Sequence, residues 1–117
     1  MSEINIPPDM ECCEEYTVKH ENTAKVIGSG DVGVLSTPSM IAFMEYTAWK
    51  CVQKYLPPNL TTVGTHVDVY HVKPAPVGCK VKVKVKLLKV EGRKLTFEVK
   101  AYWNDIEIGK GIHERFI

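Results

Sequence analysis

The sequence predicts an α+β domain in which one long helix packs against an antiparallel sheet. Residues 38–56 form a mostly apolar segment, flanked by prolines, that is long enough for one main helix. From residue 62 onward, apolar residues recur at every second position through four segments, and this is the period of strands. Short turns join the four segments, which makes them antiparallel neighbours in one sheet.

The sequence predicts a loose N-terminal arm over residues 1–13, which contain Pro7 and Pro8. A single domain is expected over residues 14–117. A chain of 117 residues has room for one hydrophobic core but not for two. Alternation from Tyr16 to His20 predicts a short first strand.

The helix is expected to begin at Pro38 and to continue to about Leu56. Thr37 can cap this helix, because a threonine hydroxyl accepts a hydrogen bond from a free backbone N–H and proline suits the first helical position. Pro57 and Pro58 end it. A helix that is apolar nearly all round must be covered by the sheet or by a second subunit.

The four later strands are expected at residues 62–72, 80–88, 94–103 and 106–117, with a bulge near Gly109. The second of them reads KVKVKVKLL, with valines facing the core and lysines facing solvent. Regular alternation without interleaved aromatic residues indicates a solvated strand face rather than a nucleic-acid site.

The charge balance argues against several classes of partner. The chain has 15 Lys and Arg against 14 Asp and Glu, so no strong field attracts nucleic acid or lipid. No apolar run approaches the length that crosses a bilayer, and the N-terminal segment lacks the basic and apolar regions of a signal peptide. We therefore expect a cytoplasmic protein that binds neither nucleic acid nor membrane.

The four cysteines do not form a metal-binding pattern. Cys12 and Cys13 are adjacent, whereas Cys51 and Cys79 stand alone. Structural zinc needs paired ligands at short spacing, and no CxxC pair is present. We expect four reduced thiols without a catalytic role, and no metal site.

A glycine-rich segment, GSGDVG at residues 28–33, matches the dinucleotide-binding pattern GxGxxG. That function requires the glycines to open a helix directly within a βαβ unit. Here the helix begins only at Pro38 and the later strands are antiparallel. The pattern therefore favours a flexible loop at the edge of a pocket.

Glu45 is the carboxylate that most needs an explanation. Its helical neighbours at three and four residues are Ile41, Ala42, Ala48 and Trp49, so no Lys or Arg on the helix can pair with it. An ionised carboxylate buried alone is costly. Glu45 must therefore either reach water or serve a function.

His71 strengthens the functional interpretation. Counting by two from Val67 and Val69 places His71 on the apolar face of its strand, where Glu45 and His71 are expected to meet. A lone histidine there is often only a satisfied core residue. A carboxylate and an imidazole in one dry place, however, make a base and an acid.

Thr37 presents a geometric difficulty. The helix between Thr37 and Glu45 rises about 12 Å, so the two side chains cannot touch along a straight helix. Either the chain before Pro38 folds back, or the two residues contact different parts of one substrate.

The spacing of Thr37, Glu45 and His71, together with the segments VGTHVDVYH, VEGRKLTFEV and GIHER, resembles the fluoroacetyl-CoA thioesterase family. The resemblance extends from Val34 to Ile117. It implies a hot-dog fold, in which one long helix is wrapped by a mainly antiparallel sheet of five or six strands. It also implies homodimers with sites at the subunit interface, and whether dimers pair into tetramers stays open.

The same resemblance implies functional roles for five residues. Thr37, Glu45 and His71 would be catalytic, Gly64 would contact the thioester, and Arg115 would contribute to substrate binding. No separate cofactor is implied, because coenzyme A is part of the substrate. Glu45 would either attack the thioester directly or deprotonate water, and the amide of Gly64 would stabilise the oxyanion.

The segment before the helix departs from the family pattern. Fluoroacetyl-CoA preference in the family depends on an aromatic lid there, whereas residues 28–35 contain no phenylalanine or tryptophan. We therefore expect hydrolysis of a short-chain acyl-CoA to free acid and CoA. The alternatives are a non-catalytic acyl-CoA-binding module and a hot-dog hydratase or dehydratase.

Overall fold

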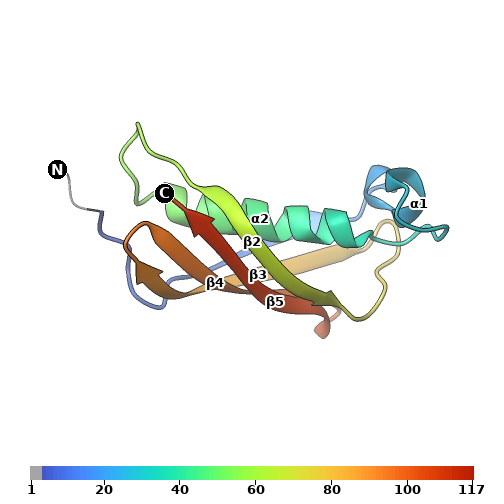
Figure 1. Cartoon of the computed structure of the whole chain (residues 1–117). Coiled ribbons are helices and arrows are strands. Elements are labelled where there is room, and N and C mark those ends of the chain that lie inside the picture. The colour runs from blue at the N-terminus through green and yellow to red at the C-terminus, as the bar shows by residue number, and fades with distance from the viewer. Residues whose placement is uncertain (1–3) are drawn as a thin grey trace.

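The computed structural model describes residues 4–117 as one long helix lying along one face of an antiparallel sheet (Figure 1). The described residues contain one sheet of five strands in the order β1-β3-β4-β5-β2, with every neighbouring pair antiparallel. The strands are β1 (Glu11–Thr17), β2 (Val63–His71), β3 (Lys80–Glu91), β4 (Lys94–Trp103) and β5 (Ile106–Phe116). The predicted α+β class with one main helix is confirmed.

The long helix α2 (Thr37–Gln53) begins one residue earlier than expected and is capped by a different side chain. The hydroxyl of Ser36 accepts a hydrogen bond from the backbone N–H of Ser39 at 3.0 Å. Ser36 is therefore the cap, and the interpretation of Thr37 as the cap was wrong. Thr37 is instead the first helical residue, which leaves its hydroxyl available for another partner.

The first strand lies earlier in the chain than the alternation of Tyr16 to His20 predicts. β1 pairs with β3 along its whole length, from Glu11 opposite Lys86 to Thr17 opposite Lys80. Residues 11–13, expected in a loose arm, are therefore part of the sheet. His20 lies in a short 3-10 helix, η1 (His20–Asn22), which is followed by the single-turn helix α1 (Ala24–Ile27).

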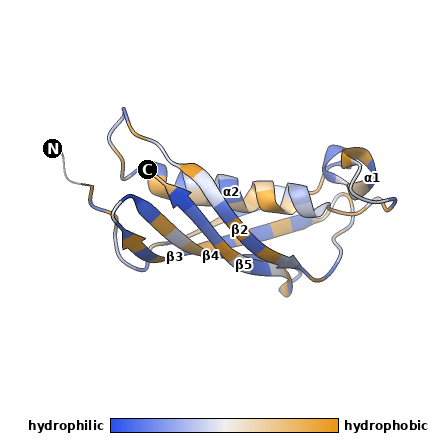
Figure 2. Cartoon of the chain, in the orientation of Figure 1, coloured by the Kyte–Doolittle hydropathy of each residue, from blue (hydrophilic) through white to orange (hydrophobic). Residues whose placement is uncertain are grey.

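The core lies between α2 and the two central strands. Met40, Met44 and Ala48 of the helix are fully buried with the inward residues of β3 and β4. On β3 the valines at 81, 83 and 85 are buried and the lysines at 80, 82 and 84 are exposed, as the alternation predicts. Figure 2 shows the resulting bands of apolar and polar residues along the strands.

A disulfide contradicts the expectation of four reduced thiols. Cys12 of β1 is bonded to Cys51 of α2, with 5.8 Å between their Cα atoms. Cys13 and Cys79 are free thiols within the described residues. Spacing along the chain could not indicate the pair, because the two cysteines are 39 residues apart and meet only when β1 runs along the helix.

Strand β2 forms one edge of the sheet and within residues 4–117 pairs only with β5. The β4–β5 pairing shifts register between Ala101 and Tyr102, opposite Ile108. The expected bulge near Gly109 is thus confirmed.

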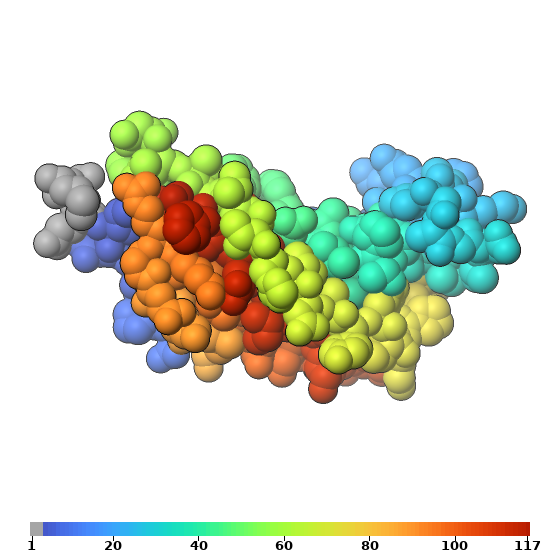
Figure 3. Space-filling view, in the orientation of Figure 1, coloured from blue at the N-terminus to red at the C-terminus, as the bar shows by residue number. Residues whose placement is uncertain are grey.

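Helix α1 and the glycine loop, which precede α2 in the chain, project from the body of the molecule (Figure 3). None of the helices described over residues 4–117 combines the length and the apolar character needed to cross a membrane.

Candidate active site

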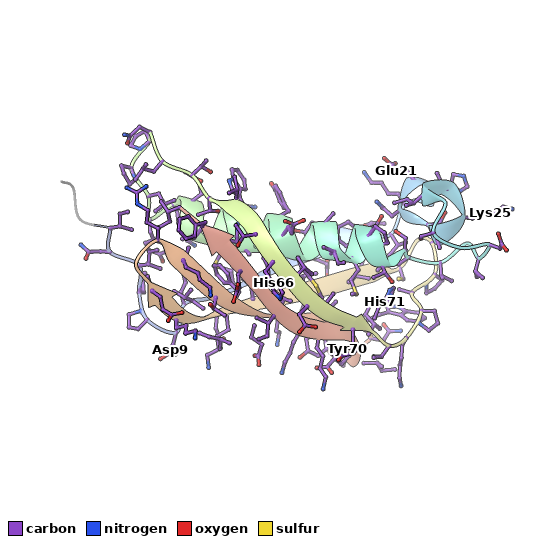
Figure 4. All side chains as sticks on the ribbon, in the orientation of Figure 1. Asp9, Glu21, Lys25, His66, Tyr70 and His71 are labelled. Atoms are coloured by element: carbon purple, nitrogen blue, oxygen red, sulfur yellow. A yellow bond between two sulfur atoms is a disulfide. The ribbon has the colours of Figure 1, made fainter. Side chains whose placement is uncertain are left out.

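Thr37 and His71 form the first of two polar clusters. The Oγ1 atom of Thr37, at the start of α2, lies 2.8 Å from Nδ1 of His71, at the end of β2. The structure therefore brings these two predicted site residues together, through the hydroxyl that does not cap the helix. Figure 4 labels His71 at the end of its strand.

His71 is half-buried, and this changes its proton affinity. Burial lowers the pKa of His71 from its ordinary value of 6.5, and a hydrogen bond with the backbone of Lys73 opposes the shift. The Nε2 atom is buried and has no hydrogen-bond partner among the described residues. The ring is thus neutral at neutral pH and can accept a proton.

An open cavity of about 430 Å³ lies beside this pair. Thr37, His71 and Lys73 line one part of it, and Ser29 and Gly30 of the glycine loop line another. The expected position of the glycine loop at a pocket edge is confirmed. The cavity is large enough for part of a small organic ligand.

Glu45 belongs to a second cluster, halfway along α2. Its Oε2 atom lies 3.8 Å from Nη1 of Arg115, and the Glu45 side chain is 42% exposed. A Cβ atom added to Gly64 would collide with the same carboxylate oxygen, so only glycine allows Glu45 to lie against the backbone of β2. Three predicted site residues, Glu45, Gly64 and Arg115, therefore meet.

The two clusters do not meet within one chain. His71 is bonded to Thr37, and about 12 Å of helix separates Thr37 from Glu45. No hydrogen bond or ion pair among the described residues joins Glu45 to His71. The expectation that these two meet within one chain was wrong, because β2 places Gly64 near Glu45 and carries His71 to the other end of the strand.

The buried side chain of Arg115 is held in place by hydrogen bonds to Thr62. Its Nε donates to Thr62 Oγ1 at 2.7 Å and its Nη2 donates to the Thr62 carbonyl oxygen at 3.0 Å. Only 5% of Arg115 is exposed. Burial lowers the pKa of Arg115 and the negative charge of Glu45 opposes this shift. An arginine keeps its charge in such surroundings, so Glu45 faces a fixed cation.

Sequence reasoning missed His113 and Thr62. His113 is 1% exposed, its Nδ1 lies 2.8 Å from the His66 carbonyl oxygen, and its Nε2 lies 3.1 Å from Arg115 Nη1. Burial is the main cause that lowers the pKa of His113. Side chains two residues apart on a strand share a face, so the period of the strand would have placed His113 on the same face as Arg115. Thr62 carries no comparable signal.

The comparisons with known proteins identify the family of this chain and its fold. A family model described as FlK, fluoroacetyl-CoA-specific thioesterase, matches residues 18–117. The curated fluoroacetyl-CoA thioesterase of Streptantibioticus cattleyicolor is 37% identical over 84 residues. That alignment covers 72% of this chain and 60% of the relative, so the chain spans less than two thirds of the length of the curated relative.

Solved structures of the same shape include a mutant of the fluoroacetyl-CoA-specific thioesterase FlK in complex with fluoroacetate and CoA. It has a TM-score of 0.90 and 28% identity, and the match covers 95% of this chain and 94% of that one. A thioesterase superfamily member from Thermus thermophilus has a TM-score of 0.86 and 29% identity, covering 99% and 85%.

A hot-dog-like protein from Thermanaerovibrio acidaminovorans is 23% identical with a TM-score of 0.86, covering 94% and 82%, and it supports the fold alone. The predicted hot-dog fold is therefore confirmed, with five strands within the described residues. The family match extends over most of the chain, including all five predicted site residues. This chain belongs to the fluoroacetyl-CoA-specific thioesterase family.

Proposed function

We propose that this protein hydrolyses a short-chain acyl-CoA to the free acid and CoA. The observation that carries the proposal is the position of Glu45, whose accessible carboxylate lies against Gly64 and 3.8 Å from the buried cation of Arg115. Arg115 places a fixed positive charge beside the carboxylate that would react. Family membership and the named activity of the curated relative support the same reaction class.

Glu45 would act on the thioester by one of two routes. It would attack the carbonyl carbon directly and form a mixed anhydride, which water then hydrolyses, or it would take a proton from the water that attacks. The backbone N–H of Gly64 would donate to the developing oxyanion. The CoA thiolate then leaves with little need for protonation.

Thr37 and His71 would join the site across a dimer interface. We place this interface at the free edge of β2, where Val63 is 61% exposed and Tyr70 is 66% exposed. An unpaired strand edge with exposed apolar side chains is a template for pairing with another copy of the same edge. Figure 4 labels His66, Tyr70 and His71 along this strand.

The register of such a dimer would complete the site. Two β2 strands that pair antiparallel about a two-fold axis near Val67 set His71 of the partner subunit opposite Val63, beside Gly64. Glu45, Gly64 and Arg115 of one subunit would then face Thr37 and His71 of the partner subunit. The two clusters would thus contact different parts of one substrate.

A panel of acyl-CoA esters, from acetyl-CoA upward, tests the proposed reaction with a reagent that reports free thiol. We expect CoA release that is fastest for short acyl chains. Tight binding without thiol release from any ester would instead indicate a non-catalytic binding module. Loss of the double bond of an enoyl-CoA without thiol release would indicate a hydratase.

A further inference from the structure

His113 on β5 is a buried ionisable residue, only 1% exposed, that the proposed reaction does not use. We propose that His113 is a positioning residue, which fixes the Arg115 guanidinium so that it faces the Glu45 carboxylate without closing onto it. This inference rests on the proposed function of Glu45 and concerns how the reactivity of that carboxylate is maintained.

The partners of the His113 ring define its protonation state. Its Nδ1 lies 2.8 Å from the carbonyl oxygen of His66, and a carbonyl oxygen only accepts, so Nδ1 carries the hydrogen. Its Nε2 lies 3.1 Å from Nη1 of Arg115, and a guanidinium only donates, so Nε2 accepts. A ring that donates from Nδ1 and accepts at Nε2 is neutral.

The surroundings of the ring keep it neutral. Burial is the main cause that lowers the pKa of His113, and the positive charge of Arg115 acts in the same direction, whereas the hydrogen bond with the His66 backbone and the charge of Glu45 oppose the shift. The titratable and charged groups that face the ring are Glu45 from α2, His66 from β2 and Arg115 from its own strand. Its neighbour across the sheet on β4 is Phe97, which carries no charge.

His113 completes a set of three neutral anchors for Arg115. Two of them come from Thr62, and His113 supplies the third, at Nη1. Nη1 is also the atom nearest to Glu45, at 3.8 Å, which is too far for a hydrogen bond. Arg115 therefore supplies its positive charge to Glu45 while both carboxylate oxygens stay free for water or a carbonyl carbon.

Loss of His113 would move the Arg115 guanidinium toward the Glu45 carboxylate. Thr62 still holds Nε and Nη2, so the guanidinium cannot leave the site. Nη1 loses its acceptor, and a buried donor without an acceptor is costly. The closest free acceptor is Glu45, so Nη1 moves into direct contact with it. A close arginine–carboxylate pair occupies an oxygen that the reaction needs.

The variant His113→Phe tests this inference in the full-length protein with the best acyl-CoA of the panel. We expect kcat to fall by roughly 10- to 100-fold, as for a misplaced reacting group, with less change in KM. His113→Gln, which keeps an amide donor and acceptor, should recover most of kcat.

His20→Phe is the matched control, since His20 is an exposed histidine of η1 outside both clusters. It should leave kcat and KM unchanged. An unchanged kcat in His113→Phe, or a fall that His113→Gln does not recover, overturns the role of His113. Absence of CoA release by the wild-type protein overturns the hydrolase itself, so the two failures are distinct.

A measurement on the wild-type protein covers the case in which His113→Phe does not fold. The ¹⁵N spectrum of the histidine rings, assigned with His113→Gln, should show His113 as the neutral Nδ1–H tautomer and keep it so as the pH is lowered below the ordinary histidine range. A charged ring, or one protonated at Nε2 instead, contradicts the inference.

Discussion

At the scale of single residues, the ionisable groups of the site are controlled by partners that are distant in the sequence. Glu45 has no cation three or four residues away on its own helix, and the cation it faces, Arg115, comes from the last strand. The Nδ1 atom of His71 is hydrogen-bonded to Thr37, at the start of the helix that carries Glu45. The fold, rather than the neighbours in the chain, therefore determines the partner of each group that could exchange a proton.

Replacement of Glu45 by glutamine tests the residue on which the reaction depends. An amide can neither attack a thioester nor take a proton from water, so we expect kcat to fall by about 100- to 10,000-fold. The control is Glu91→Gln, an exposed carboxylate at the end of β3, which should keep full activity. Full activity in Glu45→Gln would exclude both routes for this carboxylate.

The two routes for Glu45 differ in where an oxygen atom from water goes. In a single turnover in ¹⁸O-labelled water, the anhydride route places label in the Glu45 carboxylate when water attacks the anhydride at its enzyme carbonyl carbon, which releases the acyl group as the unlabelled acid. The water-activation route leaves the label only in the product acid. Mass spectrometry of the peptide that contains Glu45 separates them.

The buried histidines His71 and His113 make the stability of the folded protein depend on pH. Burial lowers the pKa of both His71 and His113 in the folded protein, so below about pH 6.5 the unfolded chain binds more protons than the folded one. The stability they contribute is therefore present above that pH and is lost as the pH falls toward the folded values.

We expect the melting temperature to fall as the pH is lowered from 6.5, measured by calorimetry. In His71→Gln the decrease should be smaller, because one of the two depressed histidines is absent. His20→Gln, at an exposed histidine, should follow the wild-type curve. Identical curves for wild type and His71→Gln would contradict the role given to burial.

At the scale of elements, β1 is attached to α2 by several different contacts along its length. Cys12 is bonded to Cys51, the Tyr16 hydroxyl lies 2.8 Å from Thr47 Oγ1, and the rings of Tyr16 and Phe43 stack at 4.4 Å. These contacts join a strand at the sheet edge to the middle and end of the helix. They explain why the strand extends back to Glu11.

Reduction of the disulfide should loosen this attachment without removing the fold. A cross-link of this kind contributes about 2–4 kcal/mol to stability, largely by restricting the unfolded chain. We expect a lower melting temperature for Cys51→Ser and for the wild type with a reducing agent. Cys13→Ser, the adjacent exposed thiol, should behave as wild type in both conditions. Equal melting temperatures with and without the reductant would contradict the contribution of this bond.

At the scale of the whole molecule, the free edge of β2 connects the two clusters to the proposed dimer. The Glu45 cluster lies at one end of this strand and His71 lies at the other. A two-fold axis between two such edges exchanges the ends, so each copy would supply what the other lacks. Without a second copy, neither cluster would hold all the residues that the family resemblance implies.

Mixed dimers test this arrangement directly. Glu45→Gln and His71→Ala are each expected to be inactive as homodimers. When the two chains are refolded together, about half of the dimers are mixed, and each has one intact site, so roughly a quarter of wild-type kcat should return. Sites contained within single chains would give no recovery, and a monomer in sedimentation experiments would also exclude the arrangement.

The sequence by itself determined most of the elements, and the family resemblance in it indicated the candidate site residues. The valine and lysine alternation of β3, the threonine before Pro38, and the absence of a cation three or four residues from Glu45 on its helix are all local properties. They depend on neighbours within about one turn or two strand positions, which a reader can count along the chain. They predicted one helix, the antiparallel strands and a carboxylate that needed a partner.

Only the tertiary structure decided which of these residues meet. Strand order brings β5 beside β2, so that Arg115 and His113 lie beside Glu45, and it carries His71 to Thr37 instead of to Glu45. The same packing pairs Cys12 with Cys51. Contacts between distant residues depend on strand order, register and helix position, and the periodicity of a single segment carries no information about these.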